Sequence, residues 1–192
     1  MSISVPETLS LNDGREVGLA WLGPQDAAPF AELACGLDAD ELNQQDLNLE
    51  DQEAVCAWLA EIGRTCFHVL AARDPGQGDA LIGYAFLKRG RYSAAHRAMV
   101  ASLLHPSFRN LGLGSGLLRE VAHLGEDLGL MFLEAEIPAS RRDLVASYKR
   151  LGFELKAILE DYRVDRQGRP YDVIILMKRL YHQVTQEFLY RY

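Results

Sequence analysis

The middle of the sequence places a strand, a glycine-rich turn and a helix in direct succession, and this unit constrains the fold more than any other feature. Residues 99–104 form a nearly continuous apolar run, which is typical of a strand buried on both faces of a sheet. Pro106 ends the strand because proline has no backbone N–H. Gly112, Gly114 and Gly116 follow, and a helix that buries residues such as Leu117 is expected next.

The glycines predict an anion site. Without side chains, they let the backbone approach a ligand closely and expose successive N–H groups. Those groups would lie at the positive end of the following helix. A phosphate or pyrophosphate group is the natural ligand for this arrangement.

Three glycine-loop patterns compete for this stretch. A nucleotide P-loop needs Gly-Lys-Ser/Thr, but Gly116 is followed by leucine. A dinucleotide fingerprint needs a third glycine where Leu117 stands, and it belongs near the start of a βαβ unit. The third pattern, Arg/Gln-x-x-Gly-x-Gly/Ala, is matched by Arg109, Gly112 and Gly114. A turn that uses glycine only for packing is the remaining alternative.

This third pattern resembles motif A of the GNAT superfamily of N-acetyltransferases, which holds the pyrophosphate of acetyl-CoA on backbone amides. Residues 148–153 resemble the family's Tyr-x-x-x-Gly-Phe ending of the next helix, and residues 171–178 resemble its final strand. The resemblance covers residues 81–180, with a weaker match over 7–33. It implies an α/β (α+β) fold: a mixed, mostly antiparallel sheet of six or seven strands, with helices on both faces and one central parallel strand pair.

We expect one domain, residues 1–180, followed by an amphipathic extension, residues 181–192, that is expected to be helical. Hydrophobic periodicity and turn residues predict the elements. The expected strands are 9–11, 16–21, 66–73, 80–88, 97–105, 130–136, 153–164 and 171–180. The expected helices are 24–37, 50–62, the helix after the glycine loop that ends at Gly129, and 140–151, with a loop at 42–49.

The resemblance implies where acetyl-CoA would bind. The two parallel strands would splay apart around its pantetheine arm, and a backbone N–H near Leu104 would bond the thioester carbonyl. Arg141 stands where many relatives have asparagine, so its contact with the cofactor differs from theirs. The cofactor-binding residues expected on this basis are Leu103, Leu104, Arg109, Asn110, Leu111, Gly112, Leu113, Gly114, Ser115, Gly116 and Arg141.

The resemblance also assigns catalytic roles. Tyr148 aligns with the family's tyrosine and is the candidate acid for the departing thiolate. Glu136, twelve residues earlier, matches the glutamate that ribosomal-protein alanine acetyltransferases use to relay the amine proton, and Glu134 is the second choice. The carboxylate that histone-acetylating relatives carry on the core strand is missing, because Ala98 and Met99 occupy the nearby positions. A buried tyrosine and a structural glutamate are the alternative interpretations.

The acceptor is expected to meet an acidic segment. Residues 38–61 contain eight Asp or Glu residues and no Lys or Arg, and this region usually borders the acceptor in the resembled family. Such a segment would attract a cationic primary amine. A solvated acidic helix surface is the alternative.

Composition excludes other classes. The net charge of −7 argues against nucleic-acid binding. No stretch approaches the apolar length of a membrane span, and the start has no signal-peptide core, so we expect a cytoplasmic protein without membrane contact. The three cysteines are expected to be buried and unpaired, and no Cys/His cluster predicts a metal. A homodimer is one assembly the sequence allows.

The sequence thus predicts an acetyltransferase that moves an acetyl group directly from acetyl-CoA to a primary amine. A non-catalytic acyl-CoA-binding or regulatory module of the same fold is the alternative from another class. A nicotinamide dinucleotide oxidoreductase is a more distant one, opposed by Leu117 and by the lack of an N-terminal βαβ unit.

Overall fold

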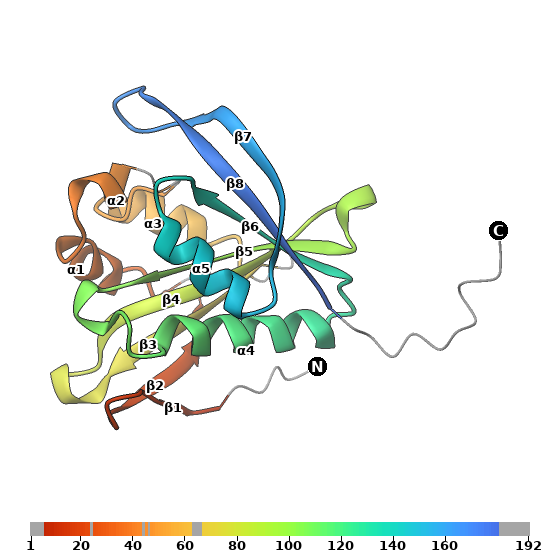
Figure 1. Cartoon of the computed structure of the whole chain (residues 1–192). Helices are drawn as coiled ribbons and strands as arrows, with labels where there is room; N and C mark the ends of the chain where they lie inside the picture. The colour runs from red at the N-terminus through yellow and green to blue at the C-terminus, as the bar shows by residue number, and fades with distance from the viewer. Residues whose placement is uncertain (1–5, 24, 44, 46, 63–66, 181–192) are drawn as a thin grey trace.

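The computed structural model describes residues 6–23, 25–43, 45, 47–62 and 67–180 (Figure 1). Its strands are β1 (Thr8–Ser10), β2 (Glu16–Trp21), β3 (Phe67–Asp74), β4 (Ala80–Arg89), β5 (Arg97–Leu104), β6 (Phe132–Pro138), β7 (Glu154–Val164) and β8 (Pro170–Arg179). Its helices are α1 (Pro29–Cys35), α2 (Ala39–Asn43), α3 (Gln52–Leu59), α4 (Leu113–Asp127) and α5 (Arg142–Arg150).

All of the strands lie in one sheet, in the order β1-β2-β3-β4-β5-β6-β8-β7. The pairs are antiparallel except for β5 and β6, which run parallel because α4 crosses between them. The expected mixed, mostly antiparallel sheet with one central parallel pair is confirmed. Its eight strands exceed the expected six or seven.

The sheet separates two hydrophobic cores. On one face, buried residues of α4, including Leu117 and Val121, pack against Val100 of β5 and Leu133 of β6. On the other face, α1 and α3 cover the sheet, as Phe30 packs in the core that also holds Phe67 and Tyr84. Helices on both faces are therefore confirmed, and the strand alternation between the two cores fixes the register of the central strands.

The parallel pair is short, and this determines where a ligand can enter. Only residues Arg97, Ala98 and Met99 of β5 pair with β6, at Phe132, Leu133 and Glu134. The opposite edge of β5 stays paired with β4 as far as Leu104. Within these described strands, β5 and β6 therefore separate beyond Met99 and leave part of the β5 edge without a neighbouring strand.

The helices on the second face differ from expectation. The first helix begins at Pro29 rather than at residue 24, with proline in its first turn. Residues 39–43 form α2, a helix that was not expected and that overlaps the start of the expected loop at 42–49; Asp38 Oδ1 accepts the Glu41 N–H at 2.7 Å at its start. Similarly, Asp51 caps α3 and delays its start to Gln52.

Two further expectations concern other parts of the chain. Cys35 and Cys56 are exposed, so the expectation that they are buried is wrong. Cys66 and the extension at 181–192 lie outside the described residues. In the part of the chain that the structure describes, no helix has both the length and the apolar character of a membrane span.

Candidate functional site

The glycine loop joins β5 to α4 through two residues in left-handed backbone conformation. Asn110 has φ 61° and Gly112 has φ 85°, and Gly112 is the residue immediately before α4. A Cβ at Gly112 would lie 3.0 Å from the Asn12 Oδ1. The Asn12 N–H also donates to the Leu111 carbonyl at 2.9 Å, so the β1–β2 turn packs against the loop and supports it.

The loop leaves the start of α4 open to a ligand. No side chain caps this helix, and the first internal bond runs from the Gly116 N–H to the Gly112 carbonyl at 2.9 Å. The N–H groups of Leu113, Gly114 and Ser115 precede that bond and therefore have no acceptor within the helix. Together with the helix dipole, they make this helix start a candidate anion site.

A cavity of about 600 Å³ lies beside this helix start. It contains nine of the predicted site residues: Leu103, Leu104, Arg109, Asn110, Gly112, Gly114, Ser115, Arg141 and Tyr148. Leu111, Leu113, Gly116 and Glu136 do not line it. Leu113 is fully buried, and a Cβ at Gly116 would overlap the Leu9 side chain, so Gly116 serves close packing against β1.

Peptide groups on the unpaired edge of β5 face this cavity. The His105 N–H donates to the Ile82 carbonyl and the Gly90 N–H to the Arg97 carbonyl, both at 2.9 Å. Odd-numbered residues of β5 therefore bond to β4, and Ser102 and Leu104 direct their N–H and C=O groups the other way. The Leu104 N–H thus lies on the unpaired edge, at the end of the splayed strand.

Tyr148 lies on α5 and reaches this strand edge. Its side chain is buried against Phe153, with ring centroids 5.1 Å apart. Burial raises the pKa of Tyr148 to about 12, and the neighbouring Ser102 only partly opposes this rise. The phenol therefore keeps its proton near neutral pH and acts as a hydrogen-bond donor.

The two glutamates of β6 lie on the opposite side of the strand from the α4 core. Glu136 Oε2 accepts Arg163 Nε at 2.9 Å and Nη2 at 2.6 Å. Glu134 Oε2 accepts Arg97 Nη1 at 2.6 Å. The structure thus places Glu136 in an ion pair with β7 and does not bring it into the cavity that contains Tyr148.

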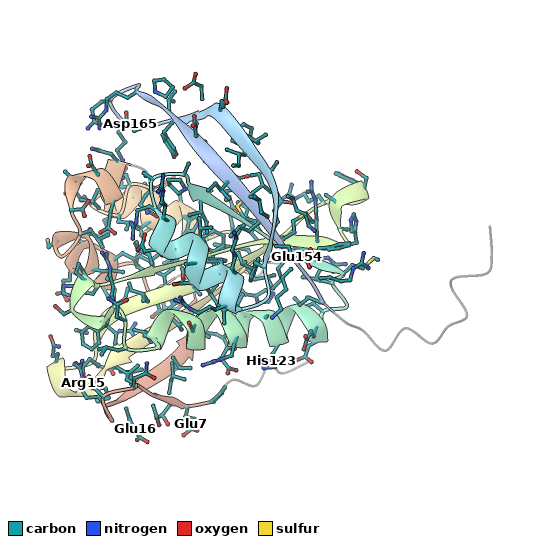
Figure 2. All side chains as sticks on the ribbon, in the orientation of Figure 1. Glu7, Arg15, Glu16, His123, Glu154 and Asp165 are labelled. Atoms are coloured by element: carbon teal, nitrogen blue, oxygen red, sulfur yellow. The ribbon has the colours of Figure 1, made fainter. Side chains whose placement is uncertain are left out.

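Much of the acidic segment 38–61 has basic partners within the described residues. The tip of the β7–β8 hairpin, where Figure 2 labels Asp165, lies over this segment, and Arg166 and Arg169 approach Glu50 and Asp40, each at 3.8 Å. Glu61 pairs with Lys88 at 2.9 Å. The negative potential of segment 38–61 is therefore weaker than its sequence suggests.

Of the lining residues that the sequence analysis did not assign to the site, Ser102 and Glu41 bear most on its chemistry. Ser102 is the single polar side chain among residues 98–104, and that contrast was a usable signal. Glu41 is only 6% exposed, and its carboxylate accepts Arg109 Nη2 at 2.8 Å and Arg141 Nη1 at 2.7 Å. Nothing in the sequence distinguishes Glu41 from the seven other acids of its segment.

The described residues contain no group of three or more His, Cys, Asp or Glu side chains arranged to hold a metal ion. The site offers the N–H donors at the start of α4, the guanidinium groups of its arginines and the hydroxyl of Tyr148. These groups suit an anionic ligand with a long unbranched arm that passes along the β5 edge.

Comparison with known proteins supports the same conclusion. A sequence comparison with curated proteins finds no significant match. The family model described as "Acetyltransferase (GNAT) family" matches residues 17–153, which is most of the chain. That match includes the glycine loop, β6 and α5.

Solved structures share the fold. The putative acetyltransferase yncA from Salmonella typhimurium, determined with acetyl-CoA, is 18% identical with a TM-score of 0.71, over 86% of this chain and 95% of that one. The ribosomal-protein-alanine N-acetyltransferase from Brucella melitensis is 23% identical with a TM-score of 0.71, over 84% and 99%. The GNAT domain of S. lividans PAT is 17% identical with a TM-score of 0.73, over 90% and 96%. The chain therefore belongs to the acetyltransferase (GNAT) family, whose reaction is the transfer of an acetyl group from acetyl-CoA.

Proposed function

We propose that the protein acetylates a primary amine by direct transfer from acetyl-CoA, without a covalent enzyme intermediate. The residues present fit the cofactor: an open helix start offers N–H donors to a pyrophosphate, and the adjoining cavity follows the free edge of β5. When bound, acetyl-CoA supplies an acyl thioester, which an amine can attack directly.

Each part of the site has a separate task in this proposal. The N–H groups of Gly114 and Ser115, which line the cavity, bind the pyrophosphate. The Leu104 N–H donates to the carbonyl oxygen as negative charge develops there. Tyr148 donates its hydroxyl hydrogen to the departing sulfur. Because the pKa of Tyr148 is raised to about 12, above the ~8.5 typical of a thiol, stabilisation by a hydrogen bond is favoured over complete proton transfer.

One observation carries this proposal. The hydroxyl of Tyr148 meets Ser102 at the unpaired edge of β5, in the same cavity as the glycine loop. A hydrogen-bond donor and an anion site are therefore connected by a channel that passes the Leu104 peptide group. This arrangement supports the proposal because one cavity offers both a hydroxyl donor and backbone N–H groups for an anion.

The first experiment is a thermal-shift titration with acetyl-CoA, CoA and NAD in parallel. A ligand that binds only the native state raises its apparent stability. We expect acetyl-CoA and CoA to raise the melting temperature and NAD to leave it unchanged. A panel of primary amines, including lysine peptides, polyamines and aminosugars, then tests for release of the CoA thiol. Binding of acetyl-CoA without product from any amine would favour a non-catalytic module.

We further propose that Glu136 accepts the amine proton, through water or directly, from the acceptor side of β6. Replacing Glu136 by glutamine is expected to lower kcat/KM about ten-fold. Glu134→Gln is the matched control. Each glutamate pairs with an arginine of its own, and the side chains of Glu134 and Glu136 are 17% and 15% exposed. Equal effects of the two substitutions would assign Glu136 a structural role.

A further inference from the structure

Glu41 occupies an unusual position for a carboxylate of a short surface helix. It is 6% exposed, and each of its oxygens accepts one N–H from a different guanidinium, Oε2 from Arg109 and Oε1 from Arg141. These three side chains line both the cavity of about 600 Å³ that contains the glycine loop and a second cavity of about 590 Å³. Glu41 therefore connects α2 to both arginines at the boundary between the two cavities.

Both arginines also have internal acceptors other than Glu41. Arg109 donates from Nε and Nη2 to the Leu104 carbonyl, at 3.3 and 3.1 Å, in addition to its bond with Glu41. Arg141 also donates to both oxygens of Asp143 at 3.3 Å. Phosphate and carboxylate oxygens fit the guanidinium fork equally well, so they are direct competitors for the same N–H groups.

We propose that Glu41 is a latch: the phosphate groups of acyl-CoA compete with its carboxylate for Arg109 and Arg141, and cofactor binding releases α2. The inference rests on the proposed function, because it requires acyl-CoA to occupy the cavity of the glycine loop. α2 is suited to such release because it has only five residues; apart from Glu41, its Leu42 packs against the core on this face of the sheet. Its Asn43 carbonyl accepts the Arg166 N–H at 3.3 Å, and Asp40 is 3.8 Å from Arg169.

The latch also changes the charge of the second cavity. That cavity is lined by three carboxylates, Asp38, Asp40 and Glu41, and by the two arginines. When phosphates neutralise the arginines, the released Glu41 carboxylate and its acidic neighbours dominate the local potential. The cavity then attracts a cation such as an ammonium group more strongly than it does in the free protein.

The test compares the affinity of CoA for the wild type and for Glu41→Gln by calorimetry. A ligand that must first break an internal contact binds with an apparent affinity reduced by the fraction of molecules in which that contact is open. Glutamine keeps the size of the side chain but removes the charge, so we expect the Kd of CoA to fall about ten-fold. Glu50→Gln is the control, because Glu50 lies in the same acidic segment, faces one arginine and lines neither cavity.

Hydrogen exchange of the wild type gives a second readout that does not depend on how the variant folds. The backbone amides of α2 are expected to exchange faster when CoA is bound. A Kd for Glu41→Gln equal to or higher than that of the wild type would overturn the latch, as would unchanged or slower exchange in α2. A wild type that fails to bind CoA at all would instead refute the proposed function.

Discussion

Replacing Tyr148 by phenylalanine is expected to lower kcat about 10²-fold while the KM for acetyl-CoA changes little. The phenyl ring keeps the contact with Phe153 and fills the same buried space, so the fold should tolerate the change. What is lost is the hydroxyl hydrogen that the proposed mechanism directs at the departing sulfur. Because that hydrogen bond strengthens as charge develops on sulfur, its loss falls mainly on kcat.

Tyr84→Phe is the matched control. Tyr84 is as buried as Tyr148, at 4% exposure, and burial raises its pKa as well, but it lies in the core on the other face of the sheet. The kcat of the Tyr84→Phe variant should match that of the wild type. Equal losses in both variants would show that Tyr148 acts only through packing.

The pH profile tests the same assignment in the wild type. The active form of Tyr148 is protonated, and its pKa is raised to about 12, so this group should cause no loss of kcat/KM between pH 7 and 10. An unshifted phenol with a pKa of ~10 would instead be half ionised at pH 10. A decline with a midpoint near pH 10 that disappears in Tyr148→Phe would contradict the effect of burial on this side chain.

The sequence predicted those features that are encoded locally. The strand, loop and helix around Gly112 follow from an apolar run, a proline and a glycine pattern that lie next to one another. The observed bounds of β5 and β8 differ from the expected ones by one residue at most. These segments are long or strongly patterned, so tertiary contacts reinforce the local preference instead of overriding it.

The features that were missed depend on contacts between distant parts of the chain. Glu41 lies 68 residues from Arg109 and 100 residues from Arg141 in the sequence. The helix that carries it, α2, has five residues, which is too short to show a helical pattern of hydrophobic residues. The pairing of Glu136 with Arg163 likewise depends on the fold of the β7–β8 hairpin. A residue type can be recognised from one sequence, but its ion-pair partner cannot be when many oppositely charged residues are available.

Replacing Gly112 by valine is expected to raise the Kd of acetyl-CoA about 10²-fold. A β-branched residue at φ 85° is strained, and its Cβ would lie 3.0 Å from the Asn12 Oδ1, so the loop must shift. The shift displaces the N–H groups of Gly114 and Ser115 from the pyrophosphate. Losing two such charge-assisted hydrogen bonds costs about 3 kcal/mol, which corresponds to the expected change in affinity.

Gly129→Val separates this effect from general strain. Gly129 follows the other end of α4 with φ 69°, and a Cβ there meets no heavy atom within 4 Å. Both variants should lose thermal stability, because valine is unfavourable in the left-handed region. Only Gly112→Val should lose acetyl-CoA binding, measured by calorimetry below the melting temperature of both variants. Binding that survives in Gly112→Val would mean that the glycine shapes the turn for packing and that the phosphates are held elsewhere.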